Sequence, residues 1–232
     1  MKFKDLIGCF YPNKCAACGE IIGEDTFLCQ LCSRKIQKND LKEFCIKCGA
    51  KKENCRCKSR EFHFSGCVST YENTDIAKKA YYSYKILRQE RLADFFALQL
   101  AETVKSAYND LEFDGLFCVP TVKRSVLKRG FDHNKLIAKR LADILNIPFI
   151  DGVIKSKHFV KPQHKSSYAK RLENVRDKYY TVKRINCNRV LLFDDICTSG
   201  ATLDQCAKEL LFAGADEVYC VTVLSVAKLK KE

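Results

Sequence analysis

The segment VLLFDDICTSGATL, residues 190–203, restricts the possible folds of this chain more than any other feature. Its first four residues are apolar, which favours a strand buried on both faces of a sheet. This apolar run ends at Asp194 and Asp195, and a turn of small and hydroxyl-bearing residues follows. Residues 201–213 then have helical spacing, and Gly214 is placed to end the helix. A buried strand that leads through a short turn into a helix is typical of a parallel α/β sheet.

The chain continues this pattern from about residue 61 onward. Apolar runs predict further strands at residues 66–72, 116–119, 147–154 and 217–224. Helical periodicity covers residues 76–108, with a break near Gln89, and residues 133–145. The stretches without periodicity, after Pro120 and over residues 155–176, are expected to be basic loops. We therefore expect an α/β domain with a mainly parallel sheet over residues 61–232.

Residues 1–60 are expected to form a separate, small, cysteine-rich zinc module. Four thiolates bind zinc as a tetrahedron, and a C-x2-C turn brings two of them to one ion. Two pairs complete one closed, structural site, and spacing alone allows sequential or interleaved pairing. Eight of the 15 cysteines lie in this module, in the close pairs Cys15 and Cys18, Cys29 and Cys32, Cys45 and Cys48, and Cys55 and Cys57.

The net charge of +13 is concentrated in two segments. Residues 121–140 contain seven lysines and arginines against one acid, and residues 155–184 contain ten against two. Zinc-bound thiolates would remove most of the positive charge of the cysteine-rich module. This distribution predicts one or two anion-binding loops rather than a uniformly cationic surface.

Two features of the sequence favour a cytoplasmic location. No apolar run approaches the roughly 20 residues of a membrane span, and the segment MKFKDLIGCFYPNKC has too short an apolar stretch for a signal peptide. In such a chain, clustered cysteine pairs are typical of metal ligands rather than of disulfides.

The turn after the 190–193 strand predicts a site for a phosphorylated sugar. Ligands of open α/β sheets bind beyond the carboxyl ends of the strands, and the free amides of a helix N-terminus bind phosphate. Thr198, Ser199 and Thr202 add hydroxyl groups to such a site. Two adjacent carboxylates can accept hydrogen bonds from neighbouring sugar hydroxyls or hold Mg²⁺ through water. Ribose 5-phosphate supplies both the phosphate and the hydroxyls.

The same segment resembles the phosphoribosyl pyrophosphate (PRPP) motif of type I phosphoribosyltransferases, in which two acids precede a Thr/Ser-Gly-x-Thr turn. The chain as a whole resembles the ComF family of competence proteins. Asp132 and His133 stand where that family usually has Asn and Gln. The resemblance rests on the four-pair cysteine module and on Val119-Pro120, Lys123-Arg124, Arg129-Gly130-Phe131, Lys161-Pro162-Gln163, Arg171, Asn174 and Val175.

The resemblance implies a type I phosphoribosyltransferase-like fold and a role for each matched residue. Asp194 and Asp195 would be the catalytic pair and would contact the ribose hydroxyls. The 5-phosphate of PRPP would be bound by Thr198, Ser199, Gly200, Ala201 and Thr202. The pyrophosphate, with bridging Mg²⁺, would be bound by Lys123, Arg124 and Arg129. Enzymes of this type displace pyrophosphate through an oxocarbenium-like state, so their residues mainly position the substrate and neutralise charge.

The basic stretch from residue 155 onward is a candidate surface for nucleic acid or a lid over the site. The candidates for DNA contacts are Lys157, Lys161, Lys165, Lys170 and Arg171. Aromatic and imidazole side chains of the same stretch could stack on bases, namely Tyr168, Tyr179, Tyr180, His158 and His164.

Three functions follow as hypotheses. The first is a ComF-like competence protein that binds PRPP·Mg²⁺ and single-stranded DNA and works with other uptake proteins at the inner membrane during natural transformation. The second is a salvage enzyme that transfers phosphoribose to a free nucleobase. The third is a non-catalytic regulator that senses PRPP. No residue stands out as a nucleobase-specific acid or base, so the acceptor of any transfer is not indicated.

Overall fold

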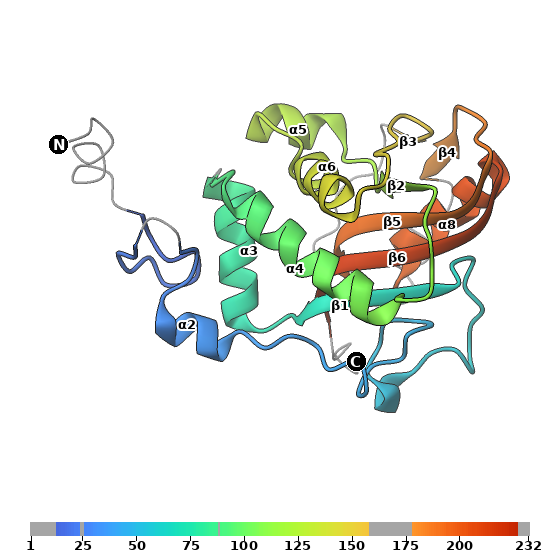
Figure 1. Ribbon diagram of the computed structural model, residues 1–232. Helices are drawn as coiled ribbons and strands as arrows, with labels where there is room; N and C mark the ends of the chain where they lie inside the picture. Colours follow the sequence, from blue (N-terminus) through green and yellow to red (C-terminus); the bar gives the residue numbers. More distant parts are fainter. Residues whose placement is uncertain (1–12, 24–25, 88, 158–177, 227–232) are drawn as a thin grey trace.

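The computed structural model describes residues 13–23, 26–87, 89–157 and 178–226. At its centre is a four-stranded parallel sheet with strand order β1-β6-β5-β2 (Figure 1). The four strands are β1 (Gly66–Glu72), β2 (Gly115–Cys118), β5 (Cys187–Cys197) and β6 (Ala215–Ser225). A separate antiparallel pair is formed by β3 (Ile154–Ser156) and β4 (Tyr179–Thr181). The predicted α/β class with a mainly parallel sheet is confirmed.

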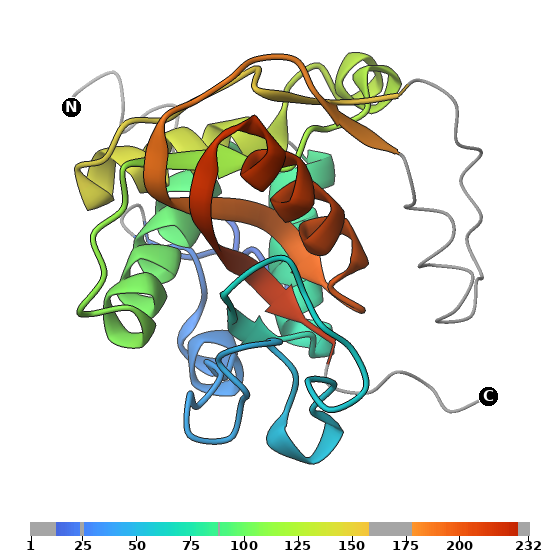
Figure 2. The ribbon, with the colours of Figure 1, turned by 90° about the vertical axis from the view of Figure 1, so that its right-hand side faces the viewer.

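Helices cover both faces of the sheet. In Figure 1, α4 and α6 lie in front of it and α8 lies behind, and Figure 2 shows α8 from the side. The covering helices are α4 (Leu92–Ala107), α6 (His133–Leu145) and α8 (Ala201–Ala213), and α3 (Asp75–Leu87) packs against α4 through Tyr81 and Tyr84. Shorter helical segments are α2 (Gln30–Lys35), η1 (Lys52–Asn54) and α5 (Lys123–Arg129).

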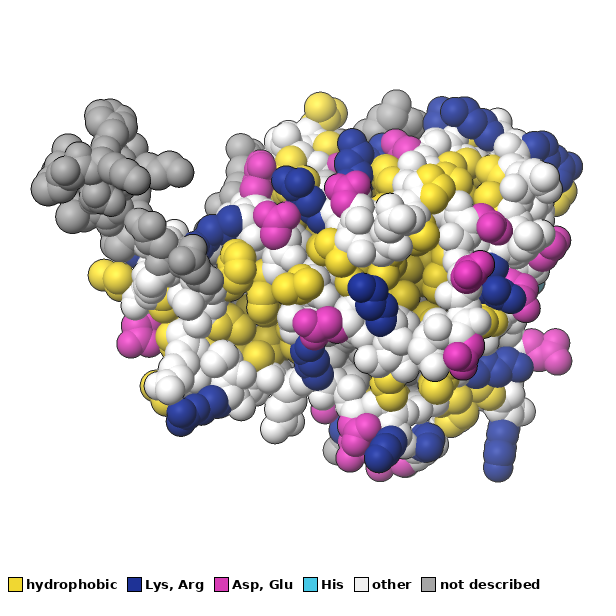
Figure 3. All heavy atoms as spheres, in the orientation of Figure 1, with side chains coloured by type: hydrophobic (Ala, Val, Ile, Leu, Met, Phe, Trp, Pro, Cys, Tyr) yellow, Lys and Arg dark blue, Asp and Glu magenta, His cyan; other side chains and the backbone are white. Residues whose placement is uncertain are grey.

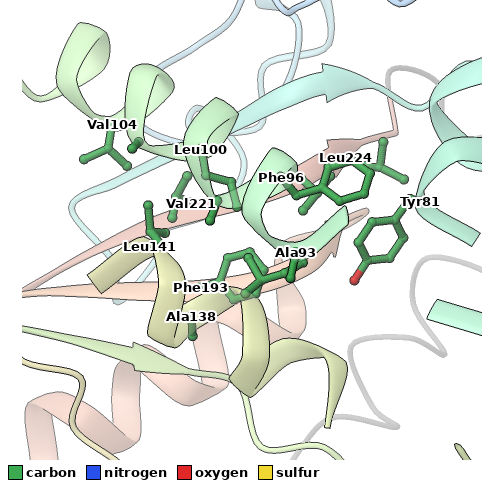
Figure 4. Packing of buried hydrophobic residues seen from close by; sticks show 14 of the residues in the cluster. Tyr81, Ala93, Phe96, Leu100, Val104, Ala138, Leu141, Phe193, Val221 and Leu224 are labelled. Carbon is green, nitrogen blue, oxygen red and sulfur yellow. The ribbon is translucent and has the colours of Figure 1, made fainter. Parts of the chain in front are cut away.

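The continuous apolar run in β5 exists because both faces of this strand are buried. Leu191 and Phe193 point toward α4 and α6, whereas Val190 and Leu192 pack on the α8 side. Figure 4 shows Phe193 on the first of these faces, packed among side chains of α4, α6 and β6. The part of β5 that leads to the carboxyl edge of the sheet is therefore tightly packed on both faces.

Several predicted elements agree with the structure and three do not. Strand β1 and helices α6 and α8 have the predicted limits, and the break near Gln89 separates α3 from α4. The predicted strand over 147–154 is wrong, because this stretch makes one bridge, Phe149 to Leu116, and β3 begins only at Ile154. The expected basic loop after Pro120 contains α5, which is too short for a clear helical period.

The third difference concerns the end of β5. The strand was expected to stop at Phe193, but it pairs with β6 as far as Cys197, opposite Ser225. Asp194 and Asp195 therefore belong to the strand itself. Backbone pairing fixes their position more firmly than a loop would.

The exposed surface in the orientation of Figure 1 has mixed charge, with lysines and arginines interspersed among acids (Figure 3). This face agrees with the prediction that the surface is not uniformly cationic. Among the described residues, no helix is both long and apolar enough to cross a bilayer.

Candidate functional site

The carboxyl ends of β2 and β5 lie side by side and bring two loops together. Cys118 pairs with Phe193, and the amide of Val119 donates to the carbonyl of Phe193 at 2.9 Å. The segment after β2 thus runs next to the two aspartates, and its continuation through α5 leads to the N-terminus of α6. The site is built where these loops meet, as parallel α/β sheets commonly arrange.

Asp195 lies in a cluster of basic side chains from two helices. It forms an ion pair with the Lys85 ammonium of α3, and its Oδ2 lies 3.6 Å from Nε2 of His133 of α6, an imidazole whose pKa is lowered by burial. Arg129 donates to the imidazole of His133 and, through Nε, to the carbonyl of Ser125 at 3.1 Å. Burial would raise the pKa of Asp195, but the hydrogen bond with His133 and the charge of Lys85 hold this pKa below its ordinary value. Asp195 is therefore ionised.

Asp194 lies in the opposite environment. Its side chain is buried, and its Oδ1 accepts from Asn134 Nδ2 at 3.2 Å and from the amide of Asp195 at 2.9 Å. Burial, reinforced by the negative charge of Asp195, raises the pKa of Asp194 well above its ordinary value. In the free site, Asp195 is therefore the ionised carboxylate. The Asp194 carboxyl group loses its proton less readily, and an incoming cation or sugar hydroxyl would help to ionise it.

The turn after β5 leads into the N-terminus of α8, and backbone amides at such a position can bind an anion. Gly200 has φ +74° and precedes α8, and this left-handed conformation favours glycine. Ser199 is buried, and its Oγ accepts from the amide of Ala201 at 3.3 Å, so this hydroxyl already supports the turn. The next amides of the first helical turn, including that of Thr202, have no intrahelical partner. The aspartate pair and the 198–202 turn are separated only by Ile196 and Cys197, the last two residues of β5.

The basic residues predicted for pyrophosphate are arranged along α5. Arg129 points into the Asp195 cluster through His133, and Arg124 is exposed on the same short helix. Lys123 begins α5, but its side chain is outside the described part of the structure. The site also includes three residues to which the sequence pattern gave no role, namely Lys85, His133 and Asn134.

Lys85 and Asn134 were missed for different reasons. Lys85 is 110 residues from Asp195 in the sequence and looks like any polar position of an amphipathic helix. Asn134 lies in the 129–134 segment that resembles the ComF family, so that segment was its signal. Asp132, the residue two before it, caps α6 by accepting from the amide of Lys135 at 3.2 Å.

Only part of the predicted DNA surface falls within the described structure. Lys157 is exposed immediately after β3, whereas Lys161, Lys165, Lys170 and Arg171 lie outside the described residues. Of the candidates for base stacking, Tyr179 is wrong, because it is buried in the core against the α8 side of the sheet. Tyr180 is 39% exposed and stays a candidate.

The cysteine pairs form two groups of four. Cys15, Cys18, Cys29 and Cys32 form one, and Cys45, Cys48, Cys55 and Cys57 form the other. Within each group all four sulfurs lie within 4.8 Å of one another, so the first pair joins the second and the third joins the fourth. The interleaved pairing does not occur.

Both groups have the dimensions of a zinc site. A Zn–S bond of about 2.3 Å places the sulfurs of a tetrahedron about 3.8 Å apart. The sulfurs of Cys18 and Cys29 are 3.7 Å apart, and those of Cys48 and Cys55 are 3.8 Å apart. Against the effect of burial, backbone amide donors lower the pKa of Cys15 to about 6 and that of Cys48 to about 7, whereas burial and the neighbouring sulfurs raise the pKa of Cys32 and of Cys57. The groups can therefore hold zinc as closed sites with four protein ligands.

Comparison with curated proteins identifies relatives along most of the chain. DNA utilization protein YhgH of Salmonella typhimurium is 24% identical over 204 residues, which cover 84% of this chain and 89% of that protein. Competence protein F of Haemophilus influenzae is 26% identical over 108 residues, covering 45% of this chain and 47% of that protein. No protein-family model matches the chain.

Solved structures with partial similarity include adenine phosphoribosyltransferase from Saccharomyces cerevisiae, with a TM-score of 0.41, 14% identity and coverage of 61% of this chain and 72% of that one. Glutamine PRPP amidotransferase from B. subtilis has a TM-score of 0.40 and 22% identity, and the match covers 61% of this chain and 30% of that one. The match to the Salmonella protein thus covers most of both chains, whereas the match to competence protein F covers less than half of each. The chain is therefore a distant homologue of DNA utilization protein YhgH and of competence protein F.

Proposed function

We propose that this protein binds PRPP with Mg²⁺ and single-stranded DNA, and that it supports DNA uptake in natural transformation. The observation that carries the proposal is the junction of Asp194 and Asp195 with the 198–202 turn at the carboxyl end of β5. The kinship with a DNA utilization protein and a competence protein supports the DNA half.

In this proposal the two aspartates bind the ribose. Asp195 is ionised in the free protein because of Lys85 and His133, so it can accept a hydrogen bond from a sugar hydroxyl at once. Asp194 would become a full acceptor once a hydroxyl or a hydrated Mg²⁺ ion approaches it. The two carboxyl groups therefore make unequal contributions, and Asp195 orients the ribose first.

The turn would bind the 5-phosphate of PRPP, and the cations opposite would bind its pyrophosphate. The free amides at the start of α8 supply donors and the positive end of a helix dipole. Lys85 and Arg129 already face the aspartate pair, and Arg124 lies on the same helix as Arg129. Mg²⁺ would share the negative charge of pyrophosphate with these side chains. This arrangement suits the departure of pyrophosphate from C1, because the developing charge is met by groups already in place.

The PRPP half is tested by the double variant Asp194→Ala/Asp195→Ala in isothermal titration calorimetry with PRPP and Mg²⁺. We expect binding to be lost, while the pair of exposed substitutions Asp110→Ala/Asp216→Ala, which removes the same charge elsewhere, leaves affinity unchanged. An unaltered PRPP affinity in the double variant would contradict the assignment of the site. Normal transformation frequency in cells that carry this variant would separate PRPP binding from DNA uptake.

The DNA half is tested by binding to a fluorescent single-stranded oligonucleotide at several salt concentrations. Each lysine or arginine that contacts a phosphate contributes about −0.7 to the slope of log K against log salt for single strands. Alanine at the candidate positions should weaken binding and flatten this slope; these are Lys157, Lys161, Lys165, Lys170 and Arg171. An equal number of exposed lysines elsewhere serves as the control, namely Lys35, Lys42, Lys52, Lys105 and Lys208. If both variants lose the same affinity, the surface assignment is wrong.

Turnover is tested separately, by measuring pyrophosphate released from PRPP with a panel of nucleobases. Release with one base would favour a salvage phosphoribosyltransferase. PRPP binding without release for any acceptor would favour a PRPP-responsive regulator. The proposal places the protein in the cytoplasm, where thiolate ligands stay reduced.

A further inference from the structure

The second cysteine group, Cys45, Cys48, Cys55 and Cys57, lies against the 198–202 turn. In the sequence, Arg56 lies between Cys55 and Cys57 of this group. Its Nη1 atom donates a hydrogen bond to the carbonyl oxygen of Thr198 at 3.0 Å. The two residues are 142 positions apart in the sequence. The Nε atom of Arg56 is buried as well, so the guanidinium reaches the turn through the interior rather than through solvent.

This hydrogen bond fixes the orientation of one peptide unit of the turn. In a trans peptide the C=O and the following N–H point in opposite directions. Because Arg56 holds the carbonyl of Thr198 on its own side, the amide of Ser199 must point to the other side of the turn. Rotation of this peptide would exchange a donor for an acceptor at the place where, in the proposed function, a phosphate binds. The Arg56 contact therefore keeps the turn in its anion-binding form.

The segment after the second group also holds the first turn of α8. Arg60 Nη2 forms an ion pair with Asp204 Oδ2 at 2.6 Å, and the amide of His63 donates to Asp204 Oδ1 at 2.7 Å. Asp204 is 8% exposed, so these contacts are shielded from solvent. On the other side of the turn, the sulfur of Cys197 lies 3.9 Å from that of Cys67.

The loop between the third pair of cysteines completes the connection. The amide of Cys67 donates to the carbonyl of Ile46 at 2.7 Å, and Gly49 packs closely on the Cys67 side chain. The second group is thus joined to the residues before, within and after the turn.

The first cysteine group has different neighbours. Its loop contacts α3 and the segment before α4, since Ser83 Oγ donates to the carbonyl of Ala16 at 2.5 Å and Arg91 donates to the carbonyl of Lys14 at 3.3 Å. Within the described residues, no hydrogen bond or ion pair joins this group to the 198–202 turn. Substitutions in the first group can therefore serve as a control for substitutions in the second group, because only the second group contacts the turn.

We propose that Arg56 is a positioning residue through which metal occupancy of the second cysteine group, and not of the first, sets the affinity of the turn for a phosphoryl group. This inference rests on the proposed PRPP site. Loss of metal would free the backbone around Arg56, release the carbonyl of Thr198 and let the peptide rotate. Because coupling between two binding sites is reciprocal, a phosphorylated ligand at the turn must in turn tighten metal binding at the second group.

The first experiment measures PRPP·Mg²⁺ affinity in zinc-loaded protein with Arg56→Ala, Arg56→Lys and the control Lys58→Ala. Lys58 is exposed in the same loop, so its removal takes away the same charge. Loss of a charged hydrogen bond should weaken binding about tenfold in Arg56→Ala. Arg56→Lys should weaken it to a similar extent, because a lysine keeps the charge but not the planar fork that reaches the carbonyl. Zinc content should stay unchanged in all three variants.

A readout without PRPP separates this inference from the proposed function. Hydrogen exchange of peptides that span residues 196–204 should be faster in Arg56→Ala than in wild type, whether or not PRPP binds. If wild-type protein fails to bind PRPP, the proposed function is wrong, while faster exchange would still support the role of Arg56. Unchanged exchange together with unchanged PRPP affinity would overturn the inference.

The second experiment compares the two metal groups directly. Cys55→Ser and Cys18→Ser each remove one exposed cysteine, from the second and the first group respectively. We expect Cys55→Ser to weaken PRPP binding about tenfold, as loss of the Arg56 contact does, and Cys18→Ser to leave it close to wild type. In wild type, PRPP should slow the release to a chelator of the zinc ion in the second group and leave the release of the zinc ion in the first group unaffected. Equal effects of the two substitutions, or equal protection of both ions, would contradict the coupling.

Discussion

At the scale of single residues, Asp194 and Asp195 show how neighbouring positions on one strand acquire opposite electrostatics. Asp195 faces Lys85 and His133, so its pKa is lowered, whereas buried Asp194 has a raised pKa. A raised folded-state pKa means that, between the unfolded and the folded pKa, the folded protein holds a proton that the unfolded chain has lost. Asp194 therefore decreases the stability of the free protein as pH rises, whereas Asp195 increases the stability.

We predict that Asp194→Asn stabilises the free protein. The asparagine oxygen can still accept from Asn134 and from the amide of Asp195, and the cost of a buried carboxyl disappears. The gain in the free energy of unfolding should be about 1–2 kcal/mol at neutral pH. It should shrink as pH falls toward about 4, where the unfolded carboxyl is protonated too. Denaturant melts at several pH values measure this, and a destabilised variant at pH 8 would contradict the environment described for Asp194.

Asp195→Asn should act in the opposite direction. Its removal leaves Lys85 and His133 without their anionic partner and should cost about 1–3 kcal/mol at pH 7. Because the folded-state pKa of Asp195 is lowered, its stabilising effect is present above the unfolded pKa of about 4 and is lost as pH falls through the folded pKa. The difference between wild type and variant should therefore narrow in acid. A difference that stays constant from pH 7 to pH 3 would show that the ion pair of Asp195 with Lys85 is not its source.

At the scale of elements, the end of α8 is a test of backbone constraint. Gly214 caps the helix with φ +120°, and a Cβ atom at this position would lie 2.3 Å from the carbonyl oxygen of Ile185. Gly214→Ala should therefore destabilise the fold by at least about 2 kcal/mol. Gly152 also has a positive φ, but its Cβ would meet only the end of Lys183 at 4.0 Å. Gly152→Ala should cost about 1 kcal/mol in thermal melts, and equal costs at the two glycines would show that the clash is unimportant.

The elements that sequence predicts well are those with strong local signals. Helix α8 has a full apolar face and a glycine at its end, and its limits were predicted. Helix α5 was missed because seven residues give less than two full turns of pattern. The extension of β5 was missed because paired carboxylates look like the end of a strand, whereas the pairing partner Thr222 lies in a distant segment.

The local part of the candidate site is visible in the sequence. The aspartate pair and the turn both lie within residues 194–202, so one pattern proposes them together, and their role in binding PRPP stays a prediction. The ion pair between Lys85 and Asp195 depends on how α3 packs against α4, which no local pattern encodes. For the same reason the sequence contained no sign that Arg56 reaches Thr198, although its place between two cysteines was visible.

At the scale of the whole molecule, the cysteine groups should contribute to stability as well as to the site. The short loops around the cysteines have little hydrophobic packing of their own. Binding of structural zinc to each group would therefore add directly to the free energy of folding. We predict that the purified protein contains two zinc ions, one for each group. A strong chelator should lower the melting temperature, and added zinc should restore it. Metal analysis that finds a single ion, or a melting temperature unaffected by chelation, would contradict this prediction.

The order of strands has a consequence for synthesis of the protein. Strand β6 is the last described strand in the sequence, yet it lies between β1 and β5 and pairs with both. Gly66 of β1 pairs with Tyr219, so β1 has no partner in the sheet until the C-terminal region is available. Contacts between such distant segments form slowly, and unpaired strand edges attract other chains. Until β6 has been synthesised, the growing chain therefore exposes an incomplete sheet, and shielding by a chaperone would matter most during that interval.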